Sequence, residues 1–408
     1  MKVAGIIAEY NPFHQGHKYQ LDMLRKQFQP DYIIVAMSGD FLQRGVPALM
    51  DKYARSRMSL LQGADLILEL PVCFATASAE SFARGGLMLF ETTGLTDALC
   101  FGAESNDLAR LTCLAHLLNQ EPDWYRDALQ SSLKLGLSFP AARAKALPEY
   151  GDLLNLPNNI LAIEYLKAME TLAPTMKPLL IQRKGSGYHD TDITAPLASA
   201  SAIRKSLLNH SSHWPALTDA LPEESWTLMQ EYEKTSSFLQ EDDFSLLLHS
   251  CLLGETRASL TEYLDMTEDL ANRIFSQKKD FVSWSSFCQS CNTKDSTYAR
   301  ISRVLTHMLL NIRKEDVSPY LTSITDTLPY LRILGFRKSA APLLTQLSRC
   351  ARAPLVTSPA AAEELLAEPD LAMLRTDIYA SDLYRCVLTG KTGRARPNEY
   401  QRKLLIVE

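Results

Sequence analysis

The chain has 408 residues, and its 42 Lys and Arg against 47 Asp and Glu give a net charge of −5. This length predicts two domains, and the composition is that of an ordinary globular protein rather than a disordered or disulfide-rich one. A slightly acidic chain is not an indiscriminate nucleic-acid binder, and with no run of about 18 apolar residues we expect no membrane-spanning segment.

The strongest signal is a strand, turn and helix near the N-terminus. Residues 3–8 form an apolar run of the length of a buried strand, and residues 18–28 have apolar side chains at helical spacing. Between them lies the sequence His14-Gln15-Gly16-His17. A helix N-terminus favours an anion, Gly16 lets the backbone approach a phosphate, and two imidazoles can stabilise its charge. We interpret the turn as a phosphate site rather than as two histidines that satisfy local hydrogen bonds.

The next segments alternate between strands and helices, which predicts a parallel sheet with helices on both faces. The expected strands are residues 32–37, 66–70, 98–101 and 178–181, and the expected helices include residues 51–61 and 78–90. Residues 106–150 are mainly helical, as an insertion or cover, and a further helix opens near Asn158. Ligands bind such sheets beyond the carboxyl ends of the strands. That edge would hold His14, His17, the Ser38-Gly39 turn and Gly102.

Two later segments have residues that suit polyphosphate. The loop after the last predicted strand, residues 182–190, contains Arg183 and two glycines, and a guanidinium forks onto phosphate oxygens. Ser201 and Arg204 then lie three residues apart, on one face of a predicted helix. A serine in the first turn can also act only as a helix cap.

From Glu223 onward the periodicity is helical, and we expect a helical C-terminal half in which residues 318–336 are a broken connection between helices. Basic residues concentrate there. Residues 294–338 contain eight Lys and Arg against four Asp and Glu, and residues 385–403 contain six against one. A solvated charged face is the alternative interpretation of each segment.

Cysteine usage indicates the compartment. Eight cysteines scattered along a long chain predict reduced thiols and a cytoplasmic protein, and the N-terminus lacks the features of a signal peptide. Cys288 and Cys291 form a single C-x-x-C, whereas structural zinc needs four ligands. We predict no metal-ligating residues.

The motifs together resemble a known family. His14-Gln15-Gly16-His17 and Ser199-Ala200-Ser201-Ala202-Ile203-Arg204 resemble the two signatures of the nucleotidyltransferase and class I aminoacyl-tRNA synthetase superfamily. The stretches 9–17, 37–45, 101–104, 157–161 and 183–190 resemble the bacterial tRNA(Met) cytidine acetate ligases more closely, as do 297–303 and 329–336 in the second half. Asp40 is a departure, because Asn is expected there.

The resemblance implies a fold and a site. The expected fold is a Rossmann-like doubly wound parallel sheet in residues 1–210, the ATP-binding catalytic domain, followed by a mainly helical domain in residues 211–408 that binds tRNA. His14, His17 and Arg204 would be catalytic. The ATP site would comprise Ile7, Ala8, Glu9, Tyr10, Asn11, Pro12, Phe13, His14, Gln15, Gly16, His17, Lys18, Tyr19, Gln20, Gly102, Asn158, Arg183 and Ser201.

The resemblance also implies a reaction. ATP and acetate would form acetyl-adenylate, with Mg²⁺ as counter-ion, and the acetyl group would pass to N4 of the wobble cytidine of elongator tRNA(Met). No membrane and no protein partner are implied. The residues expected to contact tRNA are the basic ones that lie among aromatic side chains: Arg300, Arg303, Arg332, Arg337, Lys338, Arg394, Arg396, Arg402 and Lys403.

Two other functions fit parts of the sequence. A cofactor adenylyltransferase, which joins ATP to a phosphorylated vitamin derivative, shares both signatures but leaves the basic helical half without a role. A non-catalytic RNA- or nucleotide-binding protein is the alternative outside enzymes, and the presence of His14, His17 and Arg204 argues against it.

Overall fold

Strand β1 lies inside an eight-stranded sheet whose order is β10-β8-β5-β2-β1-β6-β7, with β9 paired to β8. The computed structural model describes residues 1–184, 198–208, 214–322 and 326–408. The strands of this sheet are β1 Val3–Ala8, β2 Tyr32–Ser38, β5 Leu66–Leu70, β6 Ala98–Ala103, β7 Lys177–Gln182, β8 Leu331–Arg337, β9 Leu355–Val356 and β10 Leu405–Val407. A small hairpin, β3 Phe41–Leu42 with β4 Val46–Pro47, lies apart from it.

The five strands from the N-terminal half run parallel, from β5 through β2, β1 and β6 to β7. Their alternate side chains enter two apolar layers. Ile34 and Ala36 of β2 pack in one layer, and Ile33 and Val35 in the other. Burial on both faces explains why the strands are continuous apolar runs. This confirms the predicted parallel sheet.

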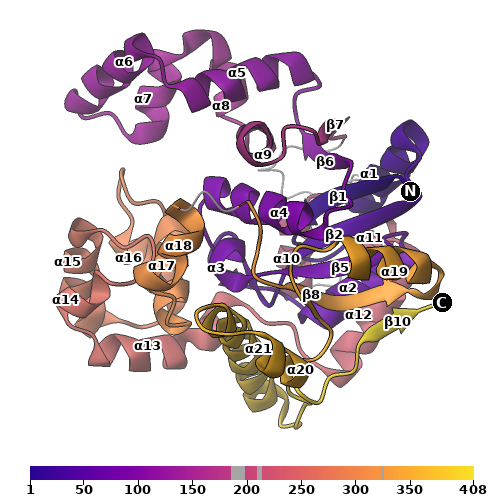
Figure 1. The fold of residues 1–408 in the computed structure, drawn as a ribbon. Coiled ribbons are helices and arrows are strands. Elements are labelled where there is room, and N and C mark those ends of the chain that lie inside the picture. Colours follow the sequence, from indigo (N-terminus) through magenta and orange to yellow (C-terminus); the bar gives the residue numbers. More distant parts are fainter. Residues whose placement is uncertain (185–197, 209–213, 323–325) are drawn as a thin grey trace.

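Helices cover both faces of the sheet (Figure 1). On one face lie α4 Ala79–Thr93 and α9 Pro157–Leu172, and on the other lie α1 Gln15–Phe28, α2 Lys52–Leu61 and α12 Glu223–Thr235. The insertion between β6 and α9 is helical, as predicted, and projects from one end of the molecule (Figure 1). It comprises α5 Leu108–Gln120, α6 Asp123–Lys134, α7 Phe139–Ala146 and α8 Gly151–Leu154.

The second half is mainly helical. Its helices are α10 Ala200–Leu208, α11 Trp214–Ala220, α12, α13 Ser245–Gly254, α14 Arg257–Leu260, α15 Glu268–Gln277, α16 Trp284–Cys291, α17 Tyr298–Leu309, α18 Lys314–Thr322, α19 Ala341–Cys350, α20 Pro359–Leu365 and α21 Asp370–Thr392; the short α3 Val72–Ala75 belongs to the first half. In the described part of the chain no helix is long and apolar enough to cross a membrane.

The prediction of a broken connection over residues 318–336 is wrong for its last third. Residues Leu331–Arg337 form β8, which pairs antiparallel with β5, and β10 pairs with β8. The first five residues of β8 are buried. The C-terminal half therefore completes the sheet of the N-terminal half, and the predicted division at residue 210 falls outside the described residues.

Polar contacts also join the two halves. The His307 ring on α17 bonds the main-chain oxygens of Leu264 (2.9 Å) and Thr76 (3.0 Å). The hydroxyls of Ser302 and Thr306 donate to the main-chain oxygen of Gly45 in the β3–β4 turn, at 2.5 and 2.8 Å. Gly45 has a φ of +68°, and a Cβ there would lie 2.3 Å from the Arg303 main chain, so only glycine fits. Helix α17 is thereby fixed against the loops that follow β2.

Candidate active site

The turn between β1 and α1 orients both histidines. His14 is the N-cap of α1, and its Nδ1 accepts the main-chain N–H of Gly16 at 3.0 Å. The Nδ1 of His17 accepts the main-chain N–H of His14 at 3.3 Å. A neutral imidazole that accepts at Nδ1 carries its proton on Nε2. Each ring therefore has one remaining N–H donor, on the side away from the main chain.

Both imidazoles are neutral. Burial lowers the pKa of His14 to about 3, and the nearby guanidinium groups of Arg183 and Arg204 contribute to this lowering. Burial also lowers the pKa of His17 well below its usual value, with contributions from His14 and Arg183. At neutral pH the turn thus presents hydrogen-bond donors, while the positive charge comes from the arginines.

Gly16 has a role that the sequence did not reveal. A Cβ at this position would lie 2.8 Å from Cε1 and 3.0 Å from Nδ1 of His14. Contacts under 3.0 Å are too close for carbon atoms, so a side chain here would displace the His14 ring. Glycine is required because the imidazole folds back over the first turn of the helix.

The second signature reaches the turn from α10. Arg204 donates from Nη1 to the main-chain oxygen of Asn11 at 2.8 Å and from Nη2 to the Ser201 hydroxyl at 3.0 Å. Burial lowers the pKa of its guanidinium, and the negative charge of Glu9 offsets only part of this lowering. Ser201 and Arg204 lie on one helix face, as predicted, and the structure brings both to the loop that carries His14.

Gly102, Asn158 and Arg183 meet around a residue that sequence reasoning did not select, Glu104. The Glu104 carboxylate accepts a hydrogen bond from the Nδ2 of Asn158 at 2.6 Å. Burial lowers the pKa of the Arg183 guanidinium, and the negative charge of Glu104 opposes this lowering. The Arg183 stem packs beside Gly102, where a Cβ would lie 3.4 Å from Cγ. The signal was present, since Glu104 closes the Phe-Gly-Ala-Glu segment after the fourth predicted strand. Residues 185–190 of the predicted phosphate loop lie outside the described residues.

The other residues expected at the ATP site line the turn and the start of α1. Tyr10 and Phe13 are buried, and their rings pack against the His17 ring at centroid distances of 4.8 and 5.5 Å. Six other residues of the expected ATP site each make a polar or cation–π contact within the chain. These pairs are Glu9 with the Gln43 N–H, Asn11 Oδ1 with the Leu49 N–H, Gln15 with the Leu221 oxygen, Lys18 with Asp22, the Tyr19 ring with Lys184, and Gln20 with Cys100.

Arg55 is a second residue that the sequence did not mark. Its side chain is fully buried in α2. It donates to the main-chain oxygens of Met50 (2.9 Å), Glu9 (2.6 Å), Ser38 (3.1 Å) and Gly39. The last three carbonyls belong to the ends of β1 and β2 and the loops after them, so one guanidinium joins both loops beneath the histidine turn.

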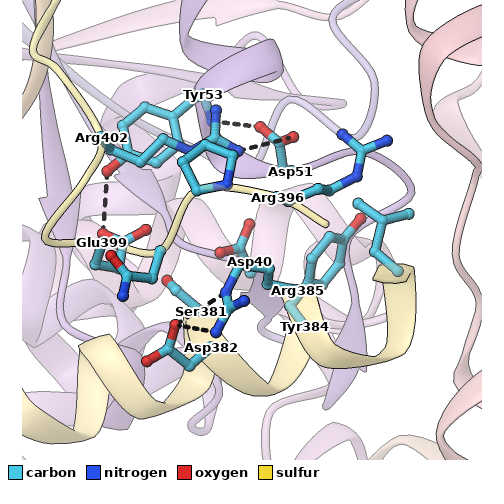
Figure 2. Close-up of a pocket in the computed structure, with 13 residues that line it drawn as sticks. Asp40, Asp51, Tyr53, Ser381, Asp382, Tyr384, Arg385, Arg396, Glu399 and Arg402 are labelled. Carbon is cyan, nitrogen blue, oxygen red and sulfur yellow. Dashed lines mark hydrogen bonds and ion pairs between the residues drawn. The ribbon is translucent and has the colours of Figure 1, made fainter. Parts of the chain in front are cut away.

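Asp40, the departure from the family pattern, faces a small pocket beside this edge (Figure 2). The cavity volume is about 20 Å³, which suits a water molecule, and Tyr53, Arg385, Arg396 and Arg402 contribute to its lining. Asp40 accepts the N–H of Lys52 at 2.7 Å, and burial raises the pKa of its carboxyl to about 6. Figure 2 shows Arg402 paired with Asp51 and Arg385 with Asp382 around it.

The basic residues expected to contact tRNA fall in different places. Arg300 and Arg303 lie on α17, with Arg303 3.5 Å from Asp265. Arg394 and Arg396 donate to the main-chain oxygens of Lys234 and Thr235, and Arg402 covers the Tyr53 ring; Lys403 is exposed.

The structure changes the picture for three of these residues, Arg332, Arg337 and Lys338. Arg332 is 4% exposed and pairs with the carboxylates of Glu69 and Glu399, so it is not available to RNA. The main-chain N–H of Arg337 donates to the main-chain oxygen of Asp65, just before β5, and the Lys338 side chain pairs with Glu408. Arg337 and Lys338 therefore lie at the edge where the parallel strands begin, opposite the histidine turn.

Comparisons with known proteins agree with this geometry. The model of the HIGH nucleotidyl transferase family matches residues 1–399. A protein of Acetivibrio thermocellus named tRNA(Met) cytidine acetate ligase is 34% identical over the full length of both chains, and one of Clostridium perfringens is 36% identical over 94% of this chain and 95% of its own. Two crystal structures of Thermotoga maritima TmcAL, one apo and one bound with alpha-thio ATP, cover both chains completely at 30% identity, with TM-scores of 0.92 and 0.90.

The parallel sheet and the paired histidines at the start of α1 are those of a HIGH nucleotidyl transferase, and the chain belongs to that family. Within it, the full-length matches make the chain a member of the tRNA(Met) cytidine acetate ligase family.

Proposed function

We propose that the chain activates acetate with ATP and acetylates N4 of the wobble cytidine of elongator tRNA(Met) in the cytoplasm. A carboxylate oxygen of acetate attacks the α-phosphorus, the bond to the β-phosphate breaks, and pyrophosphate leaves. N4 of the cytidine then attacks the acetyl carbonyl, AMP leaves, and N4 loses a proton. The matched relatives bear the name of this ligase, and the first step requires no protein nucleophile.

The observation that carries the proposal is the pair of neutral imidazoles beside two arginines. His14 and His17 each offer an Nε2–H donor, and both Arg183 and Arg204 are close enough to lower the pKa of His14. Phosphoryl transfer is catalysed by positioning and by stabilising charge on the phosphate oxygens. We assign the histidine donors to the oxygens of the reacting α-phosphate, and the arginines to the rest of the triphosphate.

Magnesium fits this site only through the nucleotide. The described residues contain no group of three or more His, Cys, Asp or Glu side chains that could hold a metal ion. Mg²⁺ keeps several waters and is commonly held by substrate phosphates with few protein ligands. Bound to the triphosphate, it would supply charge neutralisation for the leaving pyrophosphate.

The proposed tRNA surface comprises six basic residues of the second half, of which Arg394 and Lys403 are exposed and Arg300, Arg303, Arg396 and Arg402 are half-buried. Helix α17 carries Arg300 and Arg303, and its Ser302 and Thr306 hydroxyls donate to the main-chain oxygen of Gly45. Arg44, next to Gly45, interacts electrostatically with Glu9 of the histidine turn. We therefore place Arg300 and Arg303 nearest to the site of acetyl transfer. A second basic group consists of Arg394, Arg396, Arg402 and Lys403, and its Arg402 lies against Tyr53 of α2. An anticodon loop offers both phosphates and unstacked bases to such groups.

One experiment separates this function from the alternatives. Pyrophosphate release from ATP is measured with acetate, with a panel of vitamin phosphates, and with neither, and acetylation of elongator tRNA(Met) is followed by mass spectrometry. We expect release with acetate and one acetyl group per tRNA. Release only with a vitamin phosphate would identify an adenylyltransferase, and no release under any condition would identify a binding protein.

A further inference from the structure

Glu104 closes the N-terminal end of α9. One carboxylate oxygen accepts both the Nδ2 and the main-chain N–H of Asn158, at 2.6 and 3.2 Å, and the other accepts the N–H of Asn159 at 2.8 Å. Pro157, the first residue of the helix, has no N–H to offer. The first donors of α9 are thus occupied, and a negative charge already lies at the positive end of its dipole. This helix end is unsuited to a phosphate.

The same contacts fix the direction of the Asn158 side chain. An ionised carboxylate only accepts hydrogen bonds, so the amide nitrogen of Asn158 must face Glu104. Its oxygen, Oδ1, is then directed away from Glu104 and can accept a hydrogen bond. The two helix ends at this edge of the sheet differ in chemistry, because α1 presents imidazole N–H donors and α9 presents a carboxamide acceptor.

We propose that Glu104 is a positioning residue that orients Asn158 so that its Oδ1 accepts a hydrogen bond from the nucleoside part of ATP. The ligand group is an uncharged donor, either the 6-amino group of adenine or a ribose hydroxyl. This inference rests on the proposed function only in requiring that ATP binds at this edge. Arg183 supports the placement, because it lies beside both Glu104 and Gly102 and links the nucleoside side of the site to the phosphate side.

Replacement of Glu104 by Gln tests the orientation. A glutamine has one acceptor and one donor end, so it cannot accept from both Asn158 and Asn159 as the carboxylate does. We expect ATP affinity, measured by calorimetry without acetate or tRNA, to fall about three- to tenfold, as for loss of one hydrogen bond between uncharged groups. Affinity for tripolyphosphate, which reports the phosphate groups alone, should not fall, because the variant removes a negative charge near Arg183. Glu170→Gln, near the far end of α9, is the matched control and should change neither.

A second variant excludes a purely structural role. In Glu104→Gln combined with Asn158→Asp, the glutamine nitrogen faces a carboxylate, and the other aspartate oxygen faces the nucleoside. This double variant should regain most of the ATP affinity that Glu104→Gln loses. ATP analogues that lack the 6-amino group, the 2′-hydroxyl or the 3′-hydroxyl identify the donor. The relevant group is the one whose removal weakens binding to the unaltered chain but not to Glu104→Gln.

Unchanged ATP affinity in Glu104→Gln would overturn the inference, as would an equal loss of ATP and tripolyphosphate affinity, no recovery in the double variant, or no ATP binding by the unaltered chain. These outcomes are independent of the proposed reaction. If ATP binds as described but acetate causes no pyrophosphate release, the proposed function fails and the role of Glu104 stands.

Discussion

The imidazole rings of His14 and His17 are stacked, with centroids 3.9 Å apart and planes inclined by 28°. Two imidazolium ions at this distance would repel each other strongly, whereas two neutral rings do not. Burial keeps both rings neutral, and main-chain N–H groups occupy both Nδ1 atoms. The stack therefore places two uncharged N–H donors side by side, and the positive charge of the site comes from Arg183 and Arg204.

Removal of either imidazole should reduce adenylation. His14→Ala and His17→Ala should each lower acetate-dependent pyrophosphate release by about 10²–10³-fold, the usual cost of losing one transition-state donor. Thermal unfolding is the control for folding, since each variant also lacks one hydrogen bond at the start of α1. Release at the unaltered rate by a folded variant would exclude a catalytic role for that histidine.

Gly16→Ala should act through His14. The added Cβ would lie 2.8 Å from the His14 ring, so the ring must move and its Nε2–H donor with it. We expect a fall in adenylation similar to that of His14→Ala in a protein that still folds. Gly390→Ala is the matched control, because nothing lies within 4 Å of its Cβ position and alanine favours a helix there. Full activity of Gly16→Ala would contradict this account of the turn.

Arg183→Ala and Arg204→Ala should distinguish phosphate contacts from nucleoside contacts. Loss of a charge-assisted hydrogen bond costs about 1.5–3 kcal/mol, so ATP affinity should fall roughly 10- to 100-fold while adenosine affinity changes little. Calorimetric titration with both ligands measures the difference. Equal effects on ATP and adenosine would indicate that the arginines only support the loops, which Arg204 also does through Asn11.

Asp40 should make stability depend on pH. Its carboxyl pKa is raised from 3.8 to about 6 by burial, despite Lys52 and Arg55, with Asp51 and Glu399 also raising it. The folded protein thus holds this proton more tightly than the unfolded chain, so stability falls as the pH rises from about 4 to 6. Asp40→Asn removes that loss while its Oδ1 still accepts the Lys52 N–H.

We expect Asp40→Asn to gain up to about 3 kcal/mol in the free energy of unfolding at pH 8 and nothing at about pH 3.5. Denaturant unfolding at both pH values measures this, with the exposed Asp127→Asn as control. A gain of the same size at both pH values would show that ionisation of Asp40 is not the cause.

The basic residues should affect tRNA binding and not adenylation. Neutralising Arg394, Arg396, Arg402 and Lys403 together, or Arg300 and Arg303 together, should weaken tRNA binding and flatten its salt dependence. The slope should change by about one unit for each phosphate that is no longer bound. Filter binding at several salt concentrations measures the affinity and the slope, with the exposed Arg349→Gln as control.

Loss of pyrophosphate release with unchanged tRNA affinity would contradict this assignment of the basic residues. Arg337 and Lys338, neutralised as a separate pair, report whether tRNA also reaches the opposite edge of the sheet.

Local patterns determined the parts of the protein in which neighbouring residues act together. The strands β1, β2, β5, β6 and β7, the histidine turn and the Ser201–Arg204 contact follow from apolar runs, helical spacing and a three-residue separation. Each depends on residues within one or two turns of the chain. The sequence could therefore indicate both the class of fold and the side of the sheet on which the site lies.

Only the tertiary structure decided which distant residues share one place. The residues of β8 are predicted to be part of a loop because Pro329 and Gly335 lie just before and within them. They form a strand through pairing with β5, far earlier in the chain. Arg332 looks like a surface cation until Lys52, Glu69 and Glu399 are brought around it, and a buried charge is tolerated only when such partners are present. Glu104 and Arg55 likewise gain their roles from acceptors and donors far along the chain. Burial and pairing over long separations are properties of the folded chain, and no local pattern encodes them.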